Sequence, residues 1–167
     1  YLKFIPYKPK IINIGYPRWN SFLKKDKFIK YEKNKQLDFL RKKESKGVKI
    51  ILYLPTYRNS HSSQEKLEKE IFNLSEKFSK NKNIYFVYKS HFVISNKLYQ
   101  DIKCMNYLDS DPYPLFSLSS ALITDYSSVG IDYLLLDKPI SFFIFDRKQY
   151  EEYPGCYFDL DEYFNSL

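Results

Sequence analysis

The sequence is poor in the residues that cross-link small proteins or bind transition metals. Its 167 residues include two cysteines, Cys104 and Cys156, which are too few for a disulfide framework. They lack the CxxC spacing of zinc sites, and the two histidines do not cluster with them. We therefore expect free thiols in a reducing, cytoplasmic location, with no metal and no cofactor.

The sequence also lacks long apolar runs, and it has few glycines. No run reaches the roughly 18 apolar residues of a membrane-spanning helix, so this segment is not expected to cross a bilayer. Seventeen tyrosines and fourteen phenylalanines stand against four glycines and one methionine, which indicates compositional bias. Lysine and tyrosine interleave, but no RRM, KH, zinc-finger or helix-turn-helix pattern accompanies them, so we expect no nucleic-acid partner.

The net charge of +7 favours an anionic ligand, an anionic polymer or a membrane surface. Much of this charge lies in residues 21–46, where lysines accompany apolar residues at Phe28, Leu37, Phe39 and Leu40. We interpret this segment as one or two helices with a solvated lysine face. The alternative is a face that docks peripherally on the inner side of the cell membrane.

Short apolar runs with the length and content of buried strands recur along the chain. Helical patterns separate these runs, which cover residues 48–54, 84–88, 102–108, 121–123 and 140–145. The alternation is typical of about five or six parallel strands in an α/β, Rossmann-like sheet. A chain of 167 residues has the size of one domain. We predict that residues 1–20 lead into this domain and that residues 21–167 form it.

Residues 121–145 carry the clearest functional pattern: a strand, a polar turn, a helix and a second strand. Ligands of open α/β sheets bind beyond the carboxyl ends of the strands, where a helix N-terminus suits a phosphate. Ser127 and Ser128 would cap that helix and offer hydroxyl donors. Asp132, one turn further, would accept hydrogen bonds from sugar hydroxyls. The pattern predicts a nucleotide-diphosphate site, and the alternative is an ordinary capped helix with Asp132 facing solvent.

Two other predicted strands end in cationic side chains that would reach the same edge of the sheet. Thr56 and Arg58 follow one of them, and Arg58 suits a bidentate phosphate contact. Lys89 and His91 follow the next, and His91 could donate to a diphosphate or act as a general acid. The alternatives are an Arg58 that pairs with a carboxylate and a His91 that only caps the backbone.

His61 and Arg18 are secondary candidates. His61 precedes a predicted capping box, with Ser62 as the N-cap and Glu65 three residues later. Its place ahead of this helix favours solvent exposure over catalysis. Arg18 lies in a predicted turn at residues 15–20, where a structural role is more common than a ligand contact.

Four stretches occur in a characteristic order. They are Gly15-Tyr16-Pro17-Arg18, a strand ending in Pro55-Thr56-Tyr57-Arg58, Lys89-Ser90-His91, and TDYSSVGIDYLLLDKPISFF from Thr124. Together they resemble the motifs of the CDP-glycerol glycerophosphotransferases, the family that builds teichoic acids and related glycerol-phosphate capsules. The resemblance extends over residues 15–159. Four ordered motifs are a far more specific signal than any one of them alone.

The resemblance implies the C-terminal, nucleotide-binding lobe of a GT-B fold, cut from a longer protein whose N-terminal lobe is absent. It implies transfer of glycerol phosphate, or a related polyol phosphate such as ribitol phosphate, from CDP-glycerol or its analogue to a growing polymer or lipid-linked acceptor. The N-terminal lobe would be a partner and would supply the catalytic base. His91 and Arg58 would serve catalysis by neutralising the diphosphate. The donor would contact Thr56, Arg58, Lys89, His91, Asp125, Ser127, Ser128 and Asp132.

Two other classes of function stay open on the residues. A GT-B glycosyltransferase that uses a nucleotide sugar would share the sheet and the serine-containing turn. A non-catalytic nucleotide-binding module would keep the strands but lose the group of Arg58, His91 and Ser127. That group is intact, which favours an enzyme.

Overall fold

The computed structural model describes residues 10, 12, 15–19, 34–89, 103–109, 111–153, 155, 159, 161 and 162. Within these residues, five strands form one sheet in the order β3-β2-β1-β4-β5, and every neighbouring pair is parallel. The strands are β1 Lys49–Leu54, β2 Ile84–Tyr88, β3 Cys104–Asn106, β4 Ala121–Thr124 and β5 Ile140–Phe142. The predicted α/β class with a parallel sheet is therefore confirmed.

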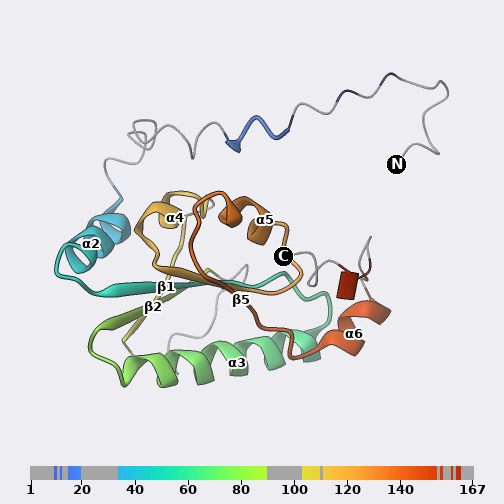
Figure 1. The fold of residues 1–167 in the computed structure, drawn as a ribbon. Coiled ribbons are helices and arrows are strands. Elements are labelled where there is room, and N and C mark those ends of the chain that lie inside the picture. The colour runs from blue at the N-terminus through green and yellow to red at the C-terminus, as the bar shows by residue number, and fades with distance from the viewer. Residues whose placement is uncertain are drawn as a thin grey trace. The chain divides into compact units, whose positions relative to one another are not determined.

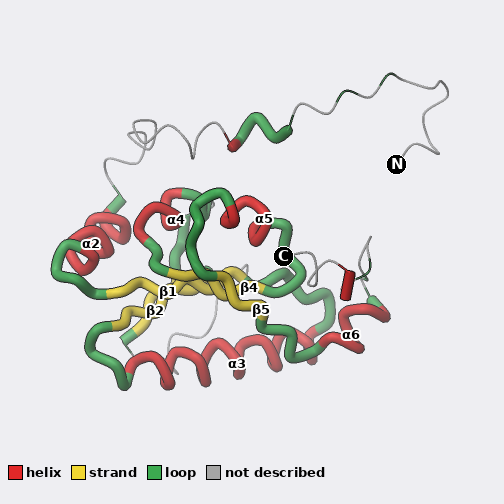
Figure 2. The backbone as a smooth tube through the Cα atoms, viewed as in Figure 1, coloured by secondary structure: helices red, strands yellow, loops and turns green. Residues whose placement is uncertain are grey.

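Helices cover both faces of this sheet (Figures 1 and 2). One face carries α2 Lys35–Glu44, α4 Pro114–Leu118 and α5 Val129–Leu134, and the other carries α3 His61–Ser79. The helix α6 Arg147–Glu152 follows β5 and lies near the first turn of α3. Among the described residues, no helix is long and apolar enough to cross a membrane.

The core follows the alternation of side chains along the central strands. Tyr53 of β1 and Phe86 of β2 pack against Leu67 and Ile71 of α3. Successive residues of a strand point to opposite faces, so Leu52 belongs to the other layer, where it is fully buried. The apolar periods of the sequence thus set which helix covers which face.

Several predicted boundaries are displaced in the structure. The N-cap of α3 is Ser60 and not Ser62: its backbone is extended, and its Oγ accepts a hydrogen bond from the Ser63 N–H at 3.2 Å. The apolar residues up to Leu136, ahead of Lys138-Pro139, predict a helix that reaches Leu136. The helix α5 ends at Leu134 instead, and Asp137 adopts a φ of +52° beyond it. The last strand ends at residue 142 rather than 145, because β4, its only neighbour among the described strands, ends at residue 124.

The chain divides into two compact units, Tyr1–Lys30 and Tyr31–Leu167, and the sheet belongs to the second. In the first unit, the Trp19 N–H donates to the carbonyl oxygen of Tyr16 at 3.0 Å, which confirms a turn. The guanidinium of Arg18 lies 4.5 Å from the centre of the Tyr16 ring. The rest of the predicted helical segment before α2, residues 21–33, lies outside the described residues.

Candidate functional site

The loops after β1 and β4 meet at the carboxyl edge of the sheet. Asp125 directly follows β4 and is fully buried. Its Oδ1 accepts hydrogen bonds from the Thr56 N–H at 2.8 Å, from the Thr56 hydroxyl at 2.5 Å and from the Tyr126 N–H at 2.7 Å. β1 and β4 are adjacent and parallel, so the polar residues that follow them necessarily share one edge.

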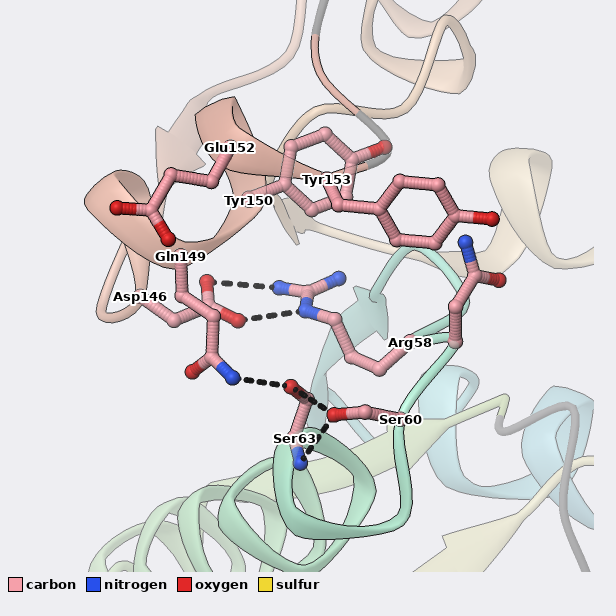
Figure 3. Close-up of a pocket in the computed structure, with 9 residues that line it drawn as sticks. Arg58, Ser60, Ser63, Asp146, Gln149, Tyr150, Glu152 and Tyr153 are labelled. Carbon is pink, nitrogen blue, oxygen red and sulfur yellow. Dashed lines mark hydrogen bonds and ion pairs between the residues drawn. The ribbon is translucent and has the colours of Figure 1, made fainter.

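Arg58 lies behind this contact and is almost completely buried, with 2% of its surface exposed. Its Nε donates to Asp146 Oδ2 at 2.6 Å, and its Nη2 donates to Asp146 Oδ1 at 3.0 Å and to Asp125 Oδ2 at 2.9 Å. Figure 3 shows the two-pronged pairing with Asp146 at the start of α6. This is the carboxylate-paired environment that the sequence left open as the alternative to a phosphate contact.

Aromatic rings enclose the Arg58 guanidinium. Its central carbon lies 5.3 Å from the ring centre of Tyr126, 5.1 Å from that of Tyr150 and 5.6 Å from that of Phe145. The rings of Tyr126 and Tyr150 stack on each other, with their centres 3.7 Å apart.

Burial alone would lower the pKa of Arg58, but the hydrogen bonds and charges of Asp146 and Asp125 outweigh it and raise that pKa above its ordinary value.

The polar turn at residues 125–128, which we call the serine turn, leads directly into α5. The Oγ of Ser127 accepts a hydrogen bond from the Val129 N–H at 3.3 Å. Ser128 occupies the N-cap position but makes no side-chain capping hydrogen bond. A Cβ on Gly130 would lie 3.4 Å from Thr124 Cγ2, so α5 packs closely on the end of β4 at this position. One of the two predicted serines therefore bonds the helix start, and the other does not.

Asp132 projects from the first turn of α5 into the protein, and only 1% of its surface is exposed. Its Oδ2 accepts a hydrogen bond from the Tyr113 hydroxyl at 2.8 Å. The alternative in which Asp132 merely faces solvent is therefore wrong. The predicted contact of Asp132 with a sugar hydroxyl stays a prediction.

The remaining candidates fall in different places. Lys89 lies at the end of β2, where its Nζ donates to the carbonyl oxygen of Asp109 at 2.6 Å. His91 lies outside the described residues. The side chain of His61 is 86% exposed, and its Nε2 lies 3.2 Å from Glu65 on the same helix, in line with the expectation of solvent exposure.

Sequence reasoning missed Asp146, Tyr126 and Tyr150 as members of this site. Asp146 lies just beyond β5, so the rule that strand ends supply functional side chains could have identified it. A cavity of about 230 Å³ lies beside Arg58, and its polar wall includes Ser63 and Gln149, which Figure 3 shows hydrogen-bonded to each other. No cluster of three or more metal-binding side chains occurs in the described part of the chain.

Comparison with known proteins shows the family to which this chain belongs. The family described as CDP-Glycerol:Poly(glycerophosphate) glycerophosphotransferase matches residues 3–166. The chain belongs to that family, which confirms the resemblance of the four motifs.

Individual relatives agree with this assignment. A teichoic acid poly(glycerol phosphate) polymerase of Bacillus spizizenii is 32% identical and is matched over 93% of this chain and 41% of its own length. A teichoic acid glycerol-phosphate primase of Bacillus subtilis is 35% identical over 87% of this chain and 36% of its own length. A teichoic acid poly(ribitol-phosphate) polymerase of Bacillus spizizenii is 28% identical over 89% of this chain and 25% of its own length. The chain thus spans well under half the length of these relatives.

Solved structures agree at the level of the fold. The wall teichoic acid polymerase TagF, in a histidine-to-asparagine variant soaked with CDPG, superposes with a TM-score of 0.56 at 29% identity. The match covers 89% of this chain and 35% of that one. A histidine-to-alanine variant of TagF gives a TM-score of 0.60 at 26% identity, over 90% of this chain and 38% of that one. The predicted lobe of a GT-B-type fold is confirmed.

Proposed function

We propose that the protein transfers glycerol phosphate, or a related polyol phosphate, from a CDP-polyol to a growing polyol-phosphate polymer or lipid-linked acceptor. In this reaction the present chain holds the CDP-polyol. The observation that carries the proposal is the serine turn at the carboxyl end of β4, tied to Thr56 by Asp125, in a chain of the glycerophosphotransferase family. An open sheet binds its ligands at this edge.

The chemistry requires little of the protein beyond position and charge. An acceptor hydroxyl oxygen attacks the β-phosphorus, the bond from that phosphorus to the bridging oxygen breaks, and CMP leaves with the bridging oxygen. The acceptor hydroxyl loses its proton to a base. The hydroxyl groups of Ser127 and Ser128, the ammonium of Lys89 and the imidazole of His91 are our candidates for stabilising the charge on the diphosphate.

Asp132 is our candidate for a contact with donor hydroxyls, because a carboxylate accepts from a polyol or a ribose equally well. Arg18 and His61 stay secondary candidates. We propose a cytoplasmic location, which the half-buried free thiol of Cys104 supports. Within the cytoplasm, we propose that the protein associates peripherally with the inner face of the membrane. The exposed basic residues Arg41 and Lys42 of α2 support this proposal.

Ribitol phosphate is the second candidate for the transferred group, because a ribitol-phosphate polymerase is among the relatives. The test is CMP release by the full-length protein with CDP-glycerol, CDP-ribitol and a UDP-sugar as competing donors. We expect acceptor-dependent release from a CDP-polyol and none of UDP from the sugar. Transfer from the UDP-sugar alone would replace the proposal with a glycosyltransferase, and binding without transfer would favour the non-catalytic module.

A further inference from the structure

We propose that Asp146 is a positioning residue for the serine turn and that it acts through Arg58. In this arrangement Arg58 serves as a buried cross-link between loops rather than as a phosphate ligand. The inference rests on the proposed function, because it concerns how the donor site is held in shape.

The hydrogen bonds of Arg58 join the ends of three strands. Nη1 donates to the Thr56 carbonyl oxygen after β1 at 2.6 Å, and Nη2 reaches Asp125 after β4. Nε and Nη2 both donate to the carboxylate of Asp146, which follows β5. The Tyr126 hydroxyl adds a second tie by donating to Asp146 Oδ1 at 3.2 Å. The serine turn is thus anchored to both neighbouring loops through one guanidinium.

The same contacts leave Arg58 poorly placed to bind a phosphate. Four of its donor contacts are directed at carboxylate or carbonyl oxygens within the protein, and its side chain is only 3% exposed. A phosphate would have to displace Asp146, whose side chain is 4% exposed and whose pairing is bidentate. Such fork-to-fork pairs are among the strongest hydrogen-bonded contacts in proteins.

Removal of the Asp146 charge would change donor binding in opposite directions, depending on whether Arg58 binds a phosphate or Asp146 positions the serine turn. One guanidinium faces two carboxylates, so the group offers no net positive field to an anionic donor. If Arg58 were a phosphate ligand restrained by Asp146, removal of the Asp146 charge would strengthen donor binding. If Asp146 positions the serine turn, its removal loosens the turn and weakens donor binding.

The experiment is Asp146→Asn in the full-length protein, because asparagine keeps the shape and removes the charge. We expect the KM for CDP-glycerol to rise about tenfold or more while the acceptor KM stays unchanged, since misplaced binding groups cost rate steeply. A lowered donor KM, or an unchanged one, would overturn the proposal. The matched control is Asp38→Asn, which breaks the exposed ion pair with Arg41 and should change neither constant.

A double-mutant cycle tests whether Asp146 acts on the serine turn through Arg58. Arg58→Lys keeps the cation but loses the planar fork, so combining it with Asp146→Asn should cost little more than either change alone. Fully additive losses in donor affinity would show that Arg58 acts on the donor independently of Asp146. Tyr126→Phe is the milder variant if the buried changes prevent folding, and it should raise the donor KM by a smaller factor.

Hydrogen exchange decides the question without a ligand. The amides of Thr56 and Tyr126 both donate to Asp125, so Asp146→Asn should speed their exchange while the amides of β2 keep their rates. Unchanged exchange at both amides would overturn the positioning role. If wild-type protein neither binds nor consumes a CDP-polyol, the proposed function fails, and the exchange result still supports or overturns the link from Asp146 to the serine turn.

Discussion

The Tyr113 hydroxyl donates to Asp132 Oδ2 at 2.8 Å, which connects the segment before α4 to the first turn of α5. A buried carboxylate is stable only when donors satisfy its oxygens. Asp132 is therefore held in a fixed orientation beside the serine turn. The same contact keeps this carboxylate ordered within the protein, where 1% of the surface of Asp132 is exposed.

Tyr113→Phe tests this relationship. Loss of the hydroxyl leaves a buried carboxylate oxygen short of a donor, so we expect the free energy of unfolding to fall by about 1–3 kcal/mol. Urea denaturation measures the change. Tyr153→Phe is the control, because Tyr153 is 72% exposed and loss of its hydroxyl should change stability little. Equal losses in the two variants would show that the Asp132 contact contributes nothing special.

The two serines of the serine turn should respond differently to alanine. Ser127→Ala removes the acceptor of the Val129 N–H and should cost about 0.5–2 kcal/mol of stability as well as donor affinity. Ser128→Ala should weaken CDP-glycerol binding by about tenfold with little loss of stability, because its hydroxyl caps no helix N–H. Calorimetric titration and thermal unfolding of both variants separate the two effects. Unchanged affinity in Ser128→Ala would remove that residue from the donor site.

The sequence was informative where one local rule determined the outcome. The run at β2 was predicted with the observed bounds, because an unbroken apolar stretch between polar residues is buried on both faces. The N-cap of α3 was misplaced because Ser60, Ser62 and Ser63 all qualify locally. One contact within the loop and one between distant residues accompany the choice of Ser60. The Gln64 side-chain amide donates to the Arg58 carbonyl oxygen at 3.0 Å, and the Gln149 side-chain amide donates to Ser63 Oγ at 2.7 Å.

The partners within the site were harder to predict because they depend on contacts between distant residues. Arg58 and Asp146 are separated by 88 positions, and neither one's neighbours in sequence indicate the pairing. The position of Arg58 after a strand favoured a phosphate as its partner, and nothing close to it in the sequence pointed to Asp146 instead. Only the parallel register of β1, β4 and β5 brings the three loops together.

His91→Ala in the full-length protein should lower turnover about 10²-fold, because a donor to the diphosphate or a general acid is lost. The fold should survive, since a residue just beyond a strand contributes little to the core. Lys80→Ala is the control: loss of a cation whose side chain is 75% exposed should leave turnover unchanged. A stable, fully active His91→Ala variant would reduce His91 to a structural role.

The last prediction separates donor binding from catalysis. The 167-residue chain should bind CDP-glycerol or CMP weakly and transfer nothing, since it matches only 41% of the length of a related polymerase. In a GT-B fold, the N-terminal lobe would close over the donor site, exclude water and align the acceptor. These contributions to lowering the barrier can reach ~7–11 kcal/mol. Calorimetric titration with CDP-glycerol measures binding, and CMP release with a glycerol-phosphate acceptor measures transfer. Acceptor-dependent turnover by this chain alone would contradict a mechanism that needs both lobes. The serine turn and Asp132 lie wholly within this chain, so the donor site should bind without the other lobe. Failure to bind any CDP ligand would therefore contradict the proposed donor site.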